Sequence, residues 1–97
     1  MIQVILRNDS LTLRGHANNN KKGKDLVCCG ASTIIYTTTN WFEKDDIDFK
    51  EDKSIPLIEI KLKKKTAKNK EYLQLAYQQL VCLAKHNKKY LKCKTLK

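Results

Sequence analysis

The sequence has no apolar run near the roughly 20 residues that a membrane-spanning helix requires. Its first residues, Met1-Ile2-Gln3-Val4, start a strand-like alternation and lack the basic and apolar segments of a secretory signal. We therefore expect a cytoplasmic protein that does not bind membranes. A chain of 97 residues has the length of one domain, and we expect a single domain over residues 1–97.

The sequence also lacks metal-binding motifs, since neither a CxxC nor an HxxxH spacing occurs, and we expect no metal and no cofactor. Its four cysteines do not form the pattern of a disulfide framework, because Cys28 and Cys29 are adjacent and Cys82 and Cys93 fall in apolar patterns. In a reducing cytosol such thiols stay free. A redox function of the adjacent pair is a further alternative, but a disulfide between neighbouring cysteines is strained.

Arginine is scarce, since Arg7 and Arg14 are the only two among 20 lysines and arginines, and the formal net charge is +10. A basic chain attracts nucleic acid, but lysine tracts without arginine clusters or interleaved aromatic residues give only non-specific attraction. We therefore expect no specific nucleic-acid partner. The charge nevertheless favours one alternative function, that of a non-catalytic, basic ribosome-associated or RNA-binding protein.

Hydrophobic periodicity predicts seven elements. Apolar and polar residues alternate in five strand-like segments, residues 2–7, 11–14, 47–49, 57–62 and 91–95. A first helix is predicted from an N-cap at Asp25 to Trp41-Phe42, with Leu26, Cys29, Thr33 (or Ile34) and Tyr36 recurring at helical spacing. A basic linker, residues 63–70, precedes a second helix over residues 73–84, with Asn87 as its stop. The order β-β-α-β-β-α-β predicts an α+β fold, a two-layer sandwich with a mainly antiparallel sheet and two helices on one face.

The connection between the second strand and the first helix holds the candidate chemistry. Gly15 allows the chain to leave the sheet, so His16 lies at a strand end, and residues 18–24 lack an apolar anchor and predict a mobile loop. With Asp25 as N-cap, Cys28 falls near the third helical position, where backbone N–H groups and the helix dipole favour a thiolate. A thiolate beside an imidazole is the pair that a cysteine nucleophile requires.

The residues around this pair have structural as well as functional interpretations. Ser32 follows Cys28 by four residues, so it either supports the thiol or bonds to the preceding helical turn. Asp25 either only caps the helix or also orients His16. The other cysteines and the second histidine have structural or solvated interpretations: Cys29, Cys82 and Cys93 as packing residues, and His86 as an exposed side chain.

The segments Gly15-His16-Ala17, Asp25, Val27-Cys28 and Ser32 resemble the ribosomal-processing cysteine protease family, Prp. The pattern of that family is Gly-His-Ala, a glycine-rich loop, then Asp-x-Val-Cys-Ala-Ala-x-Ser. The predicted element order fits it over nearly the whole chain, as does the helical segment of residues 80–84. Two departures occur. The loop carries Asn18, Asn19 and Asn20 with only Gly23 kept, and the two alanines are replaced by Cys29 and Gly30.

The resemblance implies a homodimeric, cytoplasmic cysteine endopeptidase that removes the N-terminal extension of large-subunit ribosomal protein twenty-seven and so supports ribosome assembly. It implies Cys28 as nucleophile and His16 as base, with Asp25 and Ser32 in support. The flap over the peptide would be the loop of residues 17–24, with Ala17, Asn18, Asn19, Asn20 and Gly23. From the helix start we further predict that the backbone N–H groups of Cys28 and Cys29 hold the oxyanion.

Overall fold

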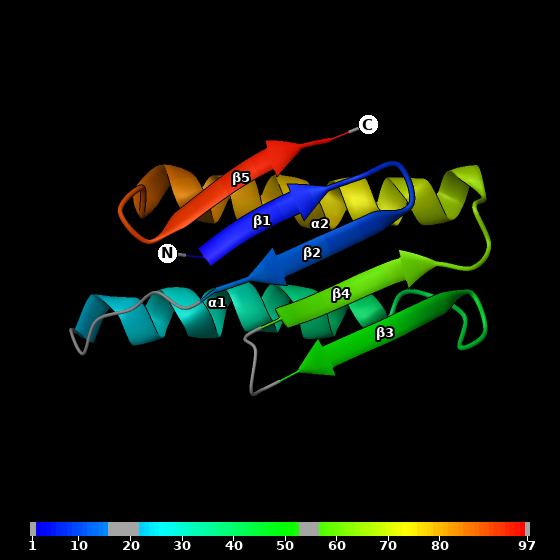
Figure 1. The fold of residues 1–97 in the computed structure, drawn as a ribbon, viewed down its shortest axis with the longest axis horizontal. Helices are drawn as coiled ribbons and strands as arrows, with labels where there is room; N and C mark the ends of the chain where they lie inside the picture. Colours follow the sequence, from blue (N-terminus) through cyan, green and yellow to red (C-terminus); the bar gives the residue numbers. More distant parts are fainter. Residues whose placement is uncertain (1, 16–21, 53–56, 97) are drawn as a thin grey trace.

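The computed structural model describes residues 2–15, 22–52 and 57–96, with the side chains of residues 22–26 and 28 outside the description. Seven elements follow one another along the chain (Figure 1): β1 (Ile2–Leu6), β2 (Ser10–Arg14), α1 (Lys22–Thr39), β3 (Ile47–Asp52), β4 (Leu57–Leu62), α2 (Ala67–His86) and β5 (Leu91–Thr95). The predicted order β-β-α-β-β-α-β is therefore confirmed.

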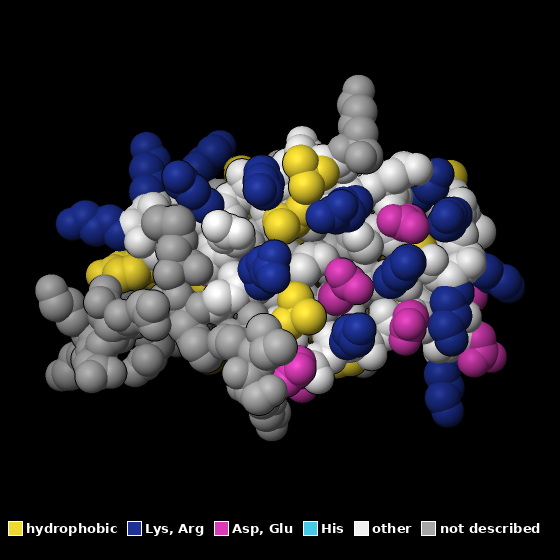
Figure 2. All heavy atoms as spheres, viewed as in Figure 1, with side chains coloured by type: hydrophobic (Ala, Val, Ile, Leu, Met, Phe, Trp, Pro, Cys, Tyr) yellow, Lys and Arg dark blue, Asp and Glu magenta, His cyan; other side chains and the backbone are white. Residues whose placement is uncertain are grey.

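The five strands form one sheet in the order β3-β4-β2-β1-β5. Three of its four pairings are antiparallel, and only β1 and β5 run parallel. Both helices cover the same face of this sheet (Figure 1), and the other face is open and carries many charged side chains (Figure 2). The predicted two-layer sandwich with a mainly antiparallel sheet is confirmed.

The core lies between the sheet and the two helices. Its largest fully buried aliphatic side chains come from both layers: Val4, Leu11, Ile60 and Leu91 from the strands, and Val27, Ile35, Leu73 and Leu80 from the helices. The helices approach closely at Gly30, where an added Cβ would lie 3.4 Å from Cδ2 of Leu83. That distance is an ordinary van der Waals contact, so the two helices pass close to each other here, as the small residues Gly30 and Ala31 indicated.

Helix α1 begins earlier than predicted and ends earlier as well. It starts at Lys22 instead of after Asp25, and it stops at Thr39 instead of reaching Trp41-Phe42. The predicted N-cap at Asp25 is therefore wrong, as is the prediction that residues 22–24, Gly23 among them, belong to the loop. Lysine is a good helix former, and one glycine costs only about 1 kcal/mol, so a run Lys-Gly-Lys does not prevent a helix. The rest of the predicted loop, residues 17–21, lies outside the described residues.

The buried stripe of α1 is also rotated from the predicted one. Val27, Ala31 and Ile35 face the core, while Cys29 is exposed and Tyr36 is 43% exposed. Thr38 completes the stripe, because its hydroxyl donates a hydrogen bond to the Ile34 carbonyl (2.6 Å) and is thereby satisfied inside the core. The interpretation of Cys29 as a packing residue is wrong.

Helix α2 begins six residues before the predicted Leu73, inside the segment interpreted as a linker. Thr66 is its N-cap, with the side-chain oxygen accepting from the Asn69 N–H, and the predicted stop at Asn87 is confirmed as the C-cap. His86, in the last turn, is exposed as expected. Cys82 is exposed as well, so its interpretation as a core residue is wrong.

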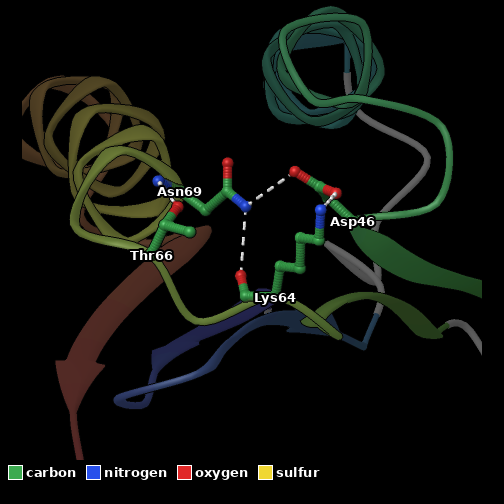
Figure 3. Close-up of polar contacts among 4 residues, drawn as sticks. All are labelled: Asp46, Lys64, Thr66 and Asn69. Carbon is green, nitrogen blue, oxygen red and sulfur yellow. Dashed lines mark hydrogen bonds and ion pairs between the residues drawn. The ribbon is translucent and has the colours of Figure 1, made fainter.

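A buried asparagine ties the start of α2 to the connection between α1 and β3 (Figure 3). Asn69 is 3% exposed. Its Nδ2 donates to Oδ2 of Asp46 (3.1 Å) and to the Lys64 carbonyl (3.0 Å), while its backbone N–H donates to the Thr66 hydroxyl (3.1 Å). The backbone carbonyl of Asp46 in turn accepts from the Lys63 N–H (2.7 Å). This cluster links two connections that are far apart in sequence.

Replacing Asn69 by alanine is expected to destabilise the protein by about 1–3 kcal/mol, because the Asp46 carboxylate and the Lys64 carbonyl each lose a buried donor. The measurement is urea unfolding followed by circular dichroism. The matched control is Gln74→Ala, at an exposed position of the same helix, for which a change within about 0.5 kcal/mol is expected. Equal unfolding midpoints for the two variants would contradict a structural role of the cluster.

Candidate active site

The chain leaves the sheet at Gly15, directly after β2 ends at Arg14. Gly15 has φ 97°, a left-handed conformation that favours glycine because other residues carry a Cβ. The expectation that this glycine turns the chain out of the sheet is confirmed. His16 comes next and lies outside the described residues. The end of β2 and the start of α1 lie at the same end of the molecule (Figure 1).

Cys28 lies on the second turn of α1, between the buried Val27 and the exposed Cys29. Successive helical residues are about 100° apart, so the backbone of Cys28 is at the border between the core side and the solvent side. Ser32 is half-buried on the same side, one turn further along.

The early start of α1 changes the expected electrostatics at Cys28. The helix dipole acts mainly within the first turn, and with a start at Lys22 that turn ends before Cys28. In addition, an N–H inside an α-helix donates to the carbonyl four residues earlier. The predicted position of Cys28 near the third helical residue is therefore wrong.

Helix α1 is held against the edge strand β3 by an aromatic and polar contact. The Tyr36 and Phe49 rings lie with centroids 6.2 Å apart, and the Tyr36 hydroxyl donates to the Glu51 carboxylate. This hydrogen bond is the main reason why the pKa of Tyr36 is raised. The contact fixes the C-terminal half of the helix that carries Cys28.

The three cysteines whose side chains are described are free thiols. Cys29 and Cys82 are exposed, while Cys93 is half-buried on β5 and packs against the core, so its interpretation as a packing residue is confirmed. Burial raises the pKa of the Cys93 thiol. The surroundings of these three thiols give no structural reason to assign any of them as the nucleophile.

The described residues hold no group of three or more His, Cys, Asp or Glu side chains that can bind a metal ion. Within the same residues, neither helix has the length and apolar character needed to cross a membrane. The sequence interpretation missed the charge pattern of the open sheet face. Its signal was present as Arg7 after β1, Arg14 at the end of β2, and Lys92 and Lys94 at alternate positions of β5, but it becomes visible only once the strand order is known.

Comparison with known proteins finds one family over nearly the whole chain. The family described as cysteine protease Prp matches residues 1–92. The ribosomal processing cysteine protease Prp of Mycoplasma pneumoniae is 38% identical over 84 residues, which cover 87% of this chain and 84% of that protein. The Mycoplasma genitalium protein of the same name is 44% identical over 62 residues, covering 64% of this chain and 63% of that protein.

The fold is also shared with a solved structure. The crystal structure of an essential ribosomal processing protease Prp from S. aureus, in complex with a covalently linked product peptide, matches with a TM-score of 0.84. The match covers 99% of this chain and 100% of that chain, at 19% sequence identity. The two-layer arrangement of five strands and two helices is therefore the same in both proteins.

Proposed function

The chain belongs to the cysteine protease Prp family, and on this premise we propose that Cys28 and His16 remove the N-terminal extension of large-subunit ribosomal protein twenty-seven. The resemblance that was seen in the sequence is thereby confirmed, and the protein is a cysteine protease. The observation that supports the two residues is the place of the described backbone next to them: Cys28 is on α1, and Gly15, which precedes His16 in the sequence, lies at the same end of the fold as the start of α1.

In the proposed mechanism, His16 takes the proton of the Cys28 thiol, and the thiolate attacks the scissile carbonyl carbon. The tetrahedral intermediate collapses to a thioester, and the protonated His16 donates its proton to the leaving amine. His16 then accepts a proton from water, whose oxygen attacks the thioester carbonyl. Release of the carboxylate product returns the thiol and the neutral imidazole.

The oxyanion role proposed for the Cys28 and Cys29 N–H groups has a structural requirement. In α1 as it stands, the Cys28 N–H has the carbonyl of residue 24 as its acceptor. We propose that this bond is released when a peptide binds, so that the Cys28 N–H can donate to the oxyanion, and that the Cys29 N–H shares its bond to residue 25 with the oxyanion.

The supporting assignments follow the family motif. We propose that Asp25 orients His16, and that Ser32, one turn after Cys28, supports the thiolate. The segment with Ala17, Asn18, Asn19 and Asn20 is proposed to close over the peptide. The protein is proposed to act in the cytoplasm as a homodimer of single-domain subunits, without a membrane partner, a cofactor or a metal.

Cleavage of the extended ribosomal protein tests this function directly. After incubation with the reduced protein, mass spectrometry is expected to show the substrate shortened by its N-terminal extension, and prior treatment with iodoacetamide is expected to stop the cleavage. An intact substrate, or cleavage that survives alkylation of Cys28, would contradict the proposal. In that case the alternative function, a non-catalytic RNA-binding protein, would account for the net charge of +10.

The rates of alkylation test the proposed pair without a substrate. Near pH 7, Cys28 is expected to react with iodoacetamide fastest, because His16 holds its proton and leaves a thiolate. Cys29 and Cys82 serve as exposed references, and Cys93 is expected to be slowest because burial raises its pKa; its rate should rise steeply as the pH increases. His16→Ala should remove the advantage of Cys28. A Cys28 rate unchanged in that variant would show that His16 is not its base.

A further inference from the structure

The open face of the sheet is divided by charge. The register places the side chains that point away from the helices in rows across the strands: Lys92, Gln3, Arg14, Leu57 and Asp52 in one row, Lys94, Ile5, Thr12, Glu59 and Lys50 in the next, and Arg7, Ser10, Lys61 and Asp48 in the third. In these rows the charged side chains of β5 and β2, and Arg7 directly after β1, are all cations, whereas the acids lie on β4 and β3. One further acid, Asp9 in the β1–β2 turn, is ion-paired with Lys65.

We name the four cations over β5, β1 and β2 the basic face: Arg7, Arg14, Lys92 and Lys94. All four are exposed, and none has a carboxylate at ion-pair distance within the described part of the chain, where the ion pairs are Lys64 with Asp46 and Lys65 with Asp9. Two more exposed lysines, Lys88 and Lys89, lie in the connection from α2 to β5, and the exposed Lys85 lies in the last turn of α2. No Asp or Glu follows Glu71 in the sequence.

This separation is more than a consequence of a lysine-rich composition. A lysine-rich composition alone would mix lysines with acids on both halves of the face, as it does over β3 and β4, where Lys50 and Lys61 lie opposite Glu59 and Asp48. On the basic face, side chains two apart on a strand lie about 7 Å from each other and repel. Such an uncompensated surface favours a partner that carries regularly spaced negative charges.

We propose that the basic face binds the sugar-phosphate backbone of RNA. The face has no aromatic side chain on which bases can stack, so contacts to phosphates and independence of base sequence are expected. Ile5 is only 6% exposed among the cations, and Leu96, directly after β5, is 38% exposed. One exposed leucine is much less than the broad apolar face by which proteins insert into membrane interfaces. The choice of RNA over DNA rests on the proposed function, in which the substrate is a ribosomal protein.

The basic face adjoins the proposed catalytic end of the molecule. Arg14 is the last residue of β2; it pairs with Gln3 on β1, which in turn pairs with Lys92 on β5. In the sequence, Arg14 is followed by Gly15 and His16. An RNA strand bound along this face therefore passes the end of β2, at Arg14 and Gly15. The protease is thereby directed to substrate molecules that are already bound to RNA.

The test is fluorescence anisotropy of a labelled, mixed-sequence single-stranded RNA, titrated with the full chain at salt concentrations from about 50 to about 200 mM. Contacts to four phosphates predict a slope of log K against log salt of roughly −3. The double variant Lys92→Gln/Lys94→Gln is expected to make the slope shallower by roughly 1.4 and to weaken binding at low salt. Lys88→Gln/Lys89→Gln, outside the strands, provides a second variant that leaves the sheet intact.

The matched control is Lys50→Gln/Lys61→Gln, which removes the same charge from the other half of the same sheet face. Unchanged RNA binding in this control is expected. Equal losses in both double variants would show attraction by net charge alone and would overturn the proposal, as would salt-independent binding or tighter binding to anionic vesicles than to RNA. The same variants are also assayed for cleavage of a short extension peptide in the absence of RNA. Cleavage without RNA binding would overturn only the RNA proposal, whereas loss of cleavage would count against the proposed protease function.

Discussion

Replacing Cys28 by alanine is expected to abolish processing of the extended ribosomal protein, with a loss in kcat on the order of 10⁶-fold. The loss is this large because nucleophile and base act as a unit: without the sulfur no thioester forms, and His16 has no proton to move. Mass spectrometry of the substrate over a time course measures the loss. In the wild type, the same spectra should show a transient mass increase on the enzyme from the acyl group on Cys28.

The neighbouring thiol provides the control for this experiment. Cys29 is exposed and differs from Cys28 by one position on α1, and the family has alanine there. Cys29→Ala is therefore expected to keep cleavage at the wild-type level, although it removes the same atoms from the same helix. Complete cleavage by the Cys28 variant, or an equal loss in both variants, would contradict the assignment of the nucleophile.

Replacing Leu80 by alanine is expected to lower the free energy of unfolding by about 2–5 kcal/mol. Leu80 is 0% exposed and packs in the layer between α2 and the sheet, so its removal leaves a cavity in addition to the lost burial. A domain of this size has a total stability of about 5–15 kcal/mol, so one substitution removes a large share of it. Urea unfolding monitored by circular dichroism gives the change in midpoint.

The same helix offers a chemically identical control. Leu75 is 53% exposed, and Leu75→Ala is expected to change the free energy of unfolding by no more than about 0.5 kcal/mol. Both variants make the same change in helix propensity. The difference between their free energies of unfolding therefore reports the effect of burial alone. Similar midpoints for the two variants would mean that the core does not lie where the packing of α2 places it.

The strands were predictable because the sheet has one covered face. Val4, Leu13 and Ile60 alternate with polar neighbours, and this alternation survives in any fold that buries a single side. The apolar face of α2 was predictable for the same reason. The start of α2 at Thr66 was not, because the first buried residue after it is the polar Asn69. Its hydrogen-bond partners, Asp46 and Lys64, are brought together only by the fold.

The rotation of α1 was not predictable from its own residues. A run of β-branched residues makes its periodicity ambiguous, and the contact that sets its face, Gly30 against Leu83, comes from the other helix. Cys29 was therefore assigned to the wrong side. The two proposed reacting residues could be chosen from the sequence, because the family motif is a short pattern along the chain. The charge separation on the open face could not be predicted, because it depends on a strand order that brings β1 and β5, from the two ends of the sequence, side by side.

The parallel pairing of β1 with β5 has a consequence for folding during synthesis. Residues 7–90 separate the two strands, so the nascent chain exposes one unpaired edge of β1 while all of this sequence is translated. At about 5–20 residues per second, the wait is on the order of 5–20 s. A ribosome-bound chain that stops before Leu91 also lacks a fully buried core residue. Folding to a complete sheet is therefore a late event in the life of the nascent chain, and the newly made protein reaches its native state only once β5 has emerged.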